Sequence, residues 1–376
     1  MESGNAMKFG IGIIGATGYI GTPYREEIRE CGDEAKIIAI CARRLDRLEQ
    51  AAVTDGAELA TTDWRAVVEH PQVNLIMVLT PDALHREPVL ASAELNKAVF
   101  CEKPVSKTIR DTTEMYRAVQ SSGIASYVPF WTRYVPVFVR VRQLIEAGKL
   151  GEVRNVIYRW HNPRPVAMPF TWRDDANLSA AGSIADVGSH IYDTLRFLLN
   201  DEADQVLTDA RTIMPPKPDL GSIDLTEAID WGETHAAGEA GATRAGSVPD
   251  YAQIAVEFKS GIVGSILLSH ASYIRKGFSP ELEIHGTKAS LSVDRNTGEI
   301  RLADSPELAR SLETISDTGF CNRFKNHVFP ALRQANSTTD HPTLYDGWRV
   351  QIFTDAALAS AQRGEWVKLS EFESAD

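Results

Sequence analysis

The feature that most constrains the fold is a glycine-rich turn near the start of the chain. An apolar run, Phe9–Ile14, leads directly into the turn Gly15-Ala16-Thr17-Gly18-Tyr19-Ile20-Gly21, and a helical pattern follows. Glycines at such a turn let the backbone bend tightly and approach a pyrophosphate, whose charge lies at the helix N-terminus. The spacing from Gly15 to Gly18 is one residue longer than in G-x-G-x-x-G. The context still predicts a dinucleotide site, with contacts from Gly15, Thr17, Gly18, Tyr19 and Ile20.

The first third of the chain alternates short apolar runs with amphipathic ones. Strands are predicted at Phe9–Ile14, Lys36–Cys41, Leu75–Leu79, Ala98–Cys101 and Ile124–Val128. Helices are predicted between them, for example at Ala83–Asn96 and Thr108–Ser121. Such alternation is typical of a parallel sheet covered on both faces. The fold class is therefore α/β, with a Rossmann domain expected over residues 7–128.

The pattern changes over residues 129–376. A helix is predicted at Tyr134–Ala147, a strand at Glu152–Trp160, a proline-rich loop at Asn162–Phe170 and a helix at Asp186–Leu199. Strands follow at Tyr251–Phe258, Ile262–His270, Glu281–His285 and Ala289–Val293. Consecutive strands predict an α+β domain with a large, mostly antiparallel open sheet. We expect a mobile loop at 236–246 and a final helix near 343–362 that packs back on the first domain.

Composition excludes several classes of protein. The formal net charge is −12, which disfavours binding to nucleic acid or to an anionic membrane. No apolar run is long enough to span a membrane, and residues 1–7 lack the apolar stretch of a signal peptide, so the expected location is the cytoplasm. The four cysteines form no C-x-x-C pair and lie near no histidine cluster, so no metal site is expected.

The end of the second predicted strand bears on the choice of cofactor. Enzymes that use NAD usually place an acidic residue there for the ribose hydroxyls. This chain has Arg43 and Arg44 instead, and its first acid, Asp46, comes later. Guanidinium groups suit a 2′-phosphate, which favours NADP, although two solvated arginines at the start of a helix would look the same.

Two further segments complete a family pattern. Cys101-Glu102-Lys103-Pro104 follows an apolar strand, and Asp186-Val187-Gly188-Ser189-His190 opens a predicted helix. Together with the glycine turn, these segments resemble the glucose-fructose oxidoreductase, inositol dehydrogenase and rhizopine-catabolism family, abbreviated Gfo/Idh/MocA. The resemblance covers nearly the whole chain, including Thr80-Pro81 with His85, and Trp172-Arg173.

The resemblance implies an NAD(P)-dependent oxidoreductase acting on a sugar, inositol or related polyol. It places Lys103, Asp186 and His190 in the active site, where a histidine can accept the hydroxyl proton and an ammonium can stabilise the alkoxide. Cofactor contacts are expected from Thr80, Pro81, His85, Glu102 and Lys103, besides Arg43 and Arg44 and the turn. Substrate contacts are expected from Lys103, Asp186, His190, Trp131, Arg133, Trp172 and Arg173, with Trp160 and His161 as weaker candidates.

Several alternatives stay open at this point. The aromatic residue Trp131 and its neighbours could be domain core instead of cleft. The same fold could use bound NAD(P) for transient oxidation during glycoside hydrolysis or epimerisation, or the protein could be a nucleotide-binding sensor without catalysis. We also expect a cis peptide bond between Lys103 and Pro104, and a homodimer or homotetramer formed through the sheet of the second domain.

Overall fold

The computed structural model describes residues 8–221, 223–236, 238–239, 241–316, 321–334 and 341–373. They divide into two compact units. The first contains residues up to 129, together with a short segment at 223–227 and a returning segment that ends at Trp348. The second contains 130–221, the described residues of 228–316, and 349–373.

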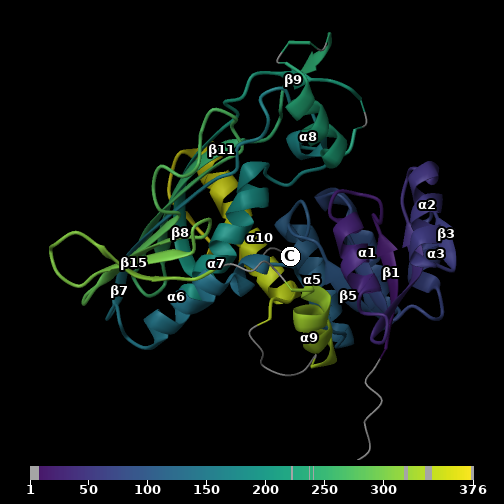
Figure 1. Ribbon diagram of the computed structural model, residues 1–376, viewed down its shortest axis with the longest axis horizontal. Helices are drawn as coiled ribbons and strands as arrows, with labels where there is room; N and C mark the ends of the chain where they lie inside the picture. The colour runs from purple at the N-terminus through teal and green to yellow at the C-terminus, as the bar shows by residue number, and fades with distance from the viewer. Residues whose placement is uncertain are drawn as a thin grey trace, which may run out of the picture. The chain divides into compact units, whose positions relative to one another are not determined.

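The first unit is built on a six-stranded sheet with the order β3-β2-β1-β4-β5-β6, of which β1, β3 and β5 are labelled in Figure 1. The strands are β1 Phe9–Ile14, β2 Ala35–Cys41, β3 Leu59–Thr61, β4 Leu75–Val78, β5 Ala98–Cys101 and β6 Ser126–Tyr127. All the pairings are parallel, as the alternation of strands and helices predicts. The interior strands β4 and β5 are almost wholly buried because both faces of the sheet are covered.

Helices connect these strands in turn. They are α1 Gly21–Arg29, α2 Leu45–Asp55, α3 Trp64–Glu69, α4 Arg86–Glu94 and α5 Ile109–Ser122. Thr108 caps α5, since its side chain accepts a hydrogen bond from the Asp111 N–H. The helix predicted at Ala83–Asn96 is instead a 3-10 turn, Asp82–Leu84, followed by α4.

The returning segment adds α9 Phe329–Arg333 and the first turn of α10 Leu344–Arg363 to the first unit. Phe329 stacks on Phe9 with ring centroids 4.7 Å apart. The indole N–H of Trp348 donates to the Thr113 hydroxyl at 3.0 Å. The start of α10 therefore packs on the Rossmann unit, while the rest of this helix belongs to the second unit.

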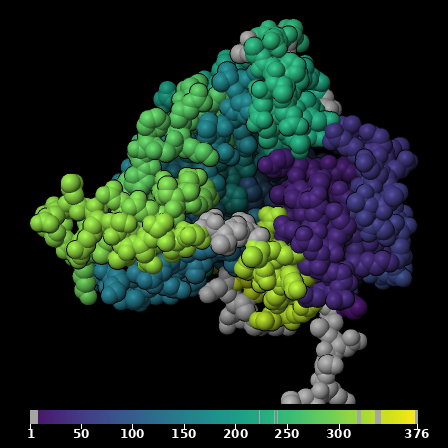
Figure 2. Space-filling view, viewed as in Figure 1, coloured from purple at the N-terminus to yellow at the C-terminus, as the bar shows by residue number. Residues whose placement is uncertain are grey.

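The second unit contains a nine-stranded sheet with the order β16-β15-β14-β13-β7-β12-β11-β8-β17. Its strands are β7 Val153–His161, β8 Ala203–Arg211, β11 Tyr251–Phe258, β12 Val263–Ser269, β13 Leu282–Gly286, β14 Ser290–Asp294, β15 Glu299–Ala303, β16 Arg310–Thr314 and β17 Val367–Lys368. One pairing, β7 with β12, is parallel, and the other described pairings in this sheet are antiparallel. Figure 2 shows the residues of the edge strand β16 and of its neighbour β15 in yellow-green at the margin of this unit.

Helices α6 Pro136–Glu146 and α7 Ser189–Leu199 pack on one face of this sheet (Figure 1). Phe138 of α6 lies against Tyr158 of β7, with ring centroids 6.2 Å apart. The helix predicted at Asp186–Leu199 begins with a π turn, Ile184–Gly188, before α7 continues it. The remaining helices are α8 Leu225–Thr234 and α11 Ser370–Glu373.

The segment predicted as a mobile loop at 236–246 is partly ordered. It contains a short strand, β10 Thr243–Arg244, which pairs antiparallel with β9 Lys217–Pro218. Residues 237 and 240 lie outside the described part of the chain. The glycine and alanine content concealed this strand because two paired residues leave no periodic pattern.

Candidate active site

The glycine turn that is predicted to bind a dinucleotide bends sharply at Gly15. Gly15 follows β1 with φ +89°, a conformation that favours glycine, and a Cβ there would come within 2.7 Å of the Leu79 carbonyl oxygen. The turn ends at Gly21, where α1 begins with no acidic residue in its first turn. Thr17, Gly18 and Ile20 are half-buried along the turn, and Tyr19 is exposed. An anion can therefore approach the start of α1 without meeting a carboxylate on that turn.

The two arginines after β2 have different surroundings. Arg44 is the N-cap residue of α2, and its guanidinium lies 2.7 Å from the Glu227 carboxylate and 3.3 Å from that of Asp46. Arg43 is exposed, and within the described part of the chain its side chain has no hydrogen-bond or ion-pair partner. Of the two groups predicted to receive a 2′-phosphate, only Arg43 is uncommitted.

Lys103 lies just beyond the end of β5, where parallel sheets bind ligands. The Lys103–Pro104 peptide bond is cis, which confirms the prediction. Glu102 before it is buried, and one carboxylate oxygen accepts from the Tyr24 hydroxyl at 2.7 Å while the other accepts from the Lys103 N–H at 3.0 Å. Burial raises the pKa of Glu102, and the nearby Lys103 partly offsets this. Through these contacts, Glu102 stabilises the loop that contains Lys103.

His85 holds the same loop from the other side. Its ring is fully buried, with Nε2 2.6 Å from the Thr80 carbonyl oxygen and Nδ1 3.0 Å from that of Val105. Burial lowers the pKa of His85, although the hydrogen bonds to these carbonyl groups work against it. The histidine thus ties the Thr80-Pro81 turn after β4 to the segment after Pro104. These contacts favour a supporting role for His85 beside the predicted cofactor site.

In the second unit, the π turn and α7 present one polar strip. Among residues 181–190, only Asp186 and His190 are not buried. The carboxylate of Asp186 lies 3.0 Å from Arg164, 3.2 Å from Arg173 and 3.1 Å from His270. These contacts hold the Asp186 carboxylate in place, and they bring in two residues, Arg164 and His270, that the sequence did not single out.

His190 has aromatic neighbours. Its ring stacks on Trp160 with centroids 5.5 Å apart and an interplanar angle of 28°. Phe130 meets it edge-on at 6.2 Å. Trp160, a weaker substrate candidate from the sequence, therefore supports the predicted catalytic base directly.

The other predicted substrate residues differ in what they contact. The guanidinium of Arg133 forms a buried, bidentate ion pair with Asp193 at 2.8 and 2.6 Å, so its hydrogen-bonding edge is used inside the protein. Arg173 lies over the Trp172 ring at 4.6 Å as well as contacting Asp186. Trp131 is half-buried and lies 6.4 Å from the Tyr134 ring. These contacts favour Trp172 and Arg173 over Arg133 as substrate-facing groups.

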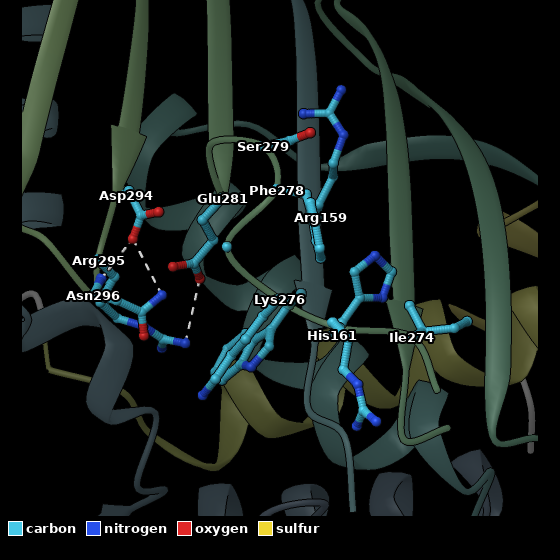
Figure 3. A pocket seen from close by; sticks show the side chains of 13 residues that line it. Arg159, His161, Ile274, Lys276, Phe278, Ser279, Glu281, Asp294, Arg295 and Asn296 are labelled. Carbon is cyan, nitrogen blue, oxygen red and sulfur yellow. Dashed lines mark hydrogen bonds and ion pairs between the residues drawn. The ribbon is translucent and has the colours of Figure 1, made fainter. Parts of the chain in front are cut away.

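A pocket of about 140 Å³ opens beside Trp160 in the second unit. Figure 3 shows Glu281 pointing toward Arg295, whose guanidinium also lies over the Trp160 ring at 3.9 Å. His161 and Lys276 also line this pocket. The pocket combines an aromatic face with hydrogen-bonding groups, which suits a polyhydroxylated ligand. Glu281 and Arg295 are separated from Trp160 by more than a hundred residues, so no local sequence pattern links the three.

Within the described residues, none of the helices has the length and the apolar composition that a membrane span requires. The same residues contain no group of three or more histidine, cysteine, aspartate or glutamate side chains arranged to hold a metal ion.

Comparisons with known proteins place the chain in a family. A model described as "Oxidoreductase family, NAD-binding Rossmann fold" matches residues 9–130, and "GFO/IDH/MocA C-terminal domain" matches 138–292. Levoglucosan dehydrogenase of Pseudarthrobacter phenanthrenivorans is 26% identical over 377 residues, 93% of this chain and 90% of that protein. Myo-inositol 2-dehydrogenase of Thermotoga maritima is 27% identical over 284 residues, which cover 76% of this chain and 75% of that protein.

Solved structures share the fold. Levoglucosan dehydrogenase in complex with NADH superposes with a TM-score of 0.80 at 23% identity, over 96% of this chain and 99% of that chain. An oxidoreductase domain protein from Kribbella flavida gives 0.81 at 25% identity over the same shares. Because the two family models together match most of both units, this chain belongs to the Gfo/Idh/MocA family of oxidoreductases and begins with an NAD-binding Rossmann fold.

Proposed function

We propose that this protein is an NAD(P)-dependent dehydrogenase or reductase that acts on a secondary hydroxyl or ketone of a sugar, inositol or related polyol. Relatives named levoglucosan dehydrogenase and myo-inositol 2-dehydrogenase support this substrate class. The observation that carries the proposal is the polar strip of Asp186 and His190 on an otherwise buried turn, with the Trp160 ring stacked on His190. When bound, the nicotinamide ring supplies the hydride acceptor or donor.

The chain's own residues supply the proton chemistry. We assign His190 as the base that takes the hydroxyl proton at an imidazole nitrogen, because histidine titrates near neutrality. The ammonium of Lys103 hydrogen-bonds the same substrate oxygen and stabilises its developing negative charge. Asp186 orders Arg164, Arg173 and His270 around the substrate side of the site.

A substrate panel tests the proposal. Sugars, inositols and sugar acids are assayed by nicotinamide absorbance with NAD and with NADP. His190→Ala and Lys103→Met should each lower turnover by about 10²–10⁴-fold on any active substrate, the usual size of acid–base assistance. His285→Ala and Lys149→Met are matched controls on side chains outside the proposed site. Wild-type rates in the His190 and Lys103 variants would refute these roles, and a panel with no active substrate would refute the substrate class.

The sequence favours NADP as the cofactor, and we assign the contact with its 2′-phosphate to Arg43. Arg44 is engaged by two carboxylates, whereas Arg43 is exposed and uncommitted among the described residues. We therefore expect Arg43→Gln to weaken NADP binding more than Arg44→Gln does, with little change for NAD. Equal effects of the two variants would contradict the assignment to Arg43.

A further inference from the structure

The segment 223–227 lies about 180 residues after Arg43 and Arg44 in the sequence, yet it contacts the arginines that follow β2. It belongs to the first unit, and α8 begins within it. Asp224 and Glu227 cap this helix reciprocally: the Glu227 N–H donates to Asp224 Oδ1 at 2.9 Å, and the Asp224 N–H donates to Glu227 Oε2 at 3.1 Å. This is a capping box, and it fixes both carboxylates in place.

The remaining carboxylate oxygens face the arginines that follow β2. Glu227 Oε1 accepts from Arg44 Nη1 at 2.7 Å and also from Arg47 Nη2. Asp224 Oδ2 accepts from Arg47 Nη1. The hydrogen bond that Arg44 donates to Glu227 raises the pKa of Arg44. Burial acts to raise the pKa of Asp224, but its hydrogen bonds with the Glu227 backbone and Arg47 outweigh this and lower it.

The local charges therefore balance. Arg43, Arg44 and Arg47 supply three positive charges, and Asp46, Asp224 and Glu227 supply three negative ones. The sequence alone showed an excess of positive charge because the acidic pair lies far along the chain. A 2′-phosphate near Arg44 would have to compete with Glu227 for the guanidinium and would meet a like charge held beside it. Since the capping box pins Oε2 of Glu227, the carboxylate cannot turn away without losing the cap.

We propose that Glu227 is a cofactor-selecting residue: it neutralises Arg44 and lowers the affinity of the adenosine end of the site for a 2′-phosphate. The inference rests on the proposed function and refines its cofactor. Arg43 attracts the 2′-phosphate and Glu227 opposes it, so the balance between NADP and NAD is set by two residues from distant parts of the chain. Neither residue touches the reacting atoms, and the effect is on binding.

Equilibrium binding of each nucleotide to the purified protein tests this, without any turnover. Glu227→Gln removes the charge and keeps an oxygen that can accept the Asp224 N–H. It should tighten NADP binding by about two- to fivefold, the size expected for a partly exposed ion pair, and leave NAD binding unchanged. The control is Glu233→Gln, which makes the same charge change at an exposed position further along α8. It should shift neither nucleotide.

The possible outcomes separate the inference from the proposed function. An unchanged ratio of NADP to NAD affinity in Glu227→Gln, or the same shift in Glu233→Gln, overturns the inference. Equal weakening of both nucleotides also overturns it, because the segment would then only support the fold, and in both cases the proposed function stands. A wild-type protein that binds neither nucleotide overturns the proposed function and the inference with it. Melting temperatures of the variants establish that each is folded.

Discussion

The Trp160 ring lies against His190 on one side of the second unit's sheet, with centroids 5.5 Å apart. Arg295 covers the Trp160 ring as well, at 3.9 Å from its centroid, and is itself 3.4 Å from the buried Glu281 carboxylate. A chain of contacts therefore runs from Glu281 through Arg295 and Trp160 to the proposed base. Trp160 acts on the chemistry through His190, which makes it a positioning residue.

Trp160→Ala should lower turnover by about tenfold to a hundredfold, because a small displacement of a catalytic group is costly. Trp160→Phe keeps an aromatic face against the imidazole and should retain most of the rate. The measurement is kcat and KM on the best substrate of the panel. Trp366→Ala, at a position that is 41% exposed, is the control for loss of a tryptophan. The proposed positioning role fails if the alanine and phenylalanine variants behave alike.

The Arg133–Asp193 pair should contribute to stability more than to substrate binding. The two side chains are buried, so Asp193→Asn leaves a buried guanidinium short of its counter-charge. We expect a loss of about 3–5 kcal/mol in the free energy of unfolding, measured by urea denaturation. Asp209→Asn is the matched control, since it breaks an exposed pair with Arg211 and should cost about 0–1 kcal/mol. Similar losses in the two variants would show that burial of the pair does not matter.

Local patterns predicted much of the fold. Strands β1 and β11 match their expected bounds, and the glycine turn leads into α1 as its spacing indicates. Short edge elements were missed, such as β3 and the pair β9 and β10, because two or three residues show no period. The parallel pairing of β7 with β12 was also missed, since sequence patterns do not state which distant strands are neighbours.

In the candidate site too, local patterns predicted individual residues but not their distant contacts. Lys103, Asp186 and His190 stand in recognisable segments, and the sequence singled them out. The partners of the predicted site residues lie in segments without a recognisable pattern. His270 is 84 positions from Asp186, and Glu227 is 183 positions from Arg44. Ion pairs between distant segments depend on the tertiary fold. The sequence therefore indicated two free positive charges, at Arg43 and Arg44, although Glu227 neutralises the charge of Arg44 in the fold.

We expect copies of the chain to associate through the sheet of the second unit. Exposed and buried positions alternate along most of β12, and Val263 is 45% exposed on the more exposed face. If copies of the chain associate through this face, Val263→Arg should shift the protein toward monomer in light scattering at micromolar concentration. Lys288→Arg is a conservative change on the same unit and should leave the mass unchanged. A wild-type protein that is already monomeric would rule out the expected dimer or tetramer.

Glu281 gives a prediction for pH. Its Oε1 lies 3.2 Å from the Tyr158 hydroxyl and 3.4 Å from Arg295, while Oε2 is buried with no hydrogen-bond partner among the described residues. Burial raises the pKa of this carboxyl, and Arg295 and Tyr158 only partly offset the effect. The folded protein therefore keeps this proton at pH values where the unfolded chain has lost it.

The sign of the effect on stability follows from that difference. The stabilising contribution of protonated Glu281 is fully present below the unfolded pKa of about 4.3 and is lost as the pH rises through the higher folded pKa. Glu281→Gln cannot ionise, so the free energy of unfolding of the wild type minus that of the variant should fall as the pH rises above about 4.3, then level off. Urea denaturation of both proteins between pH 4 and 8 measures this difference, in which the other titrating groups cancel. Glu307→Gln, at an exposed position, should not show the trend. A difference for Glu281→Gln that is flat or rises with pH would mean that Arg295 dominates over burial and that the carboxyl is ionised in the folded protein.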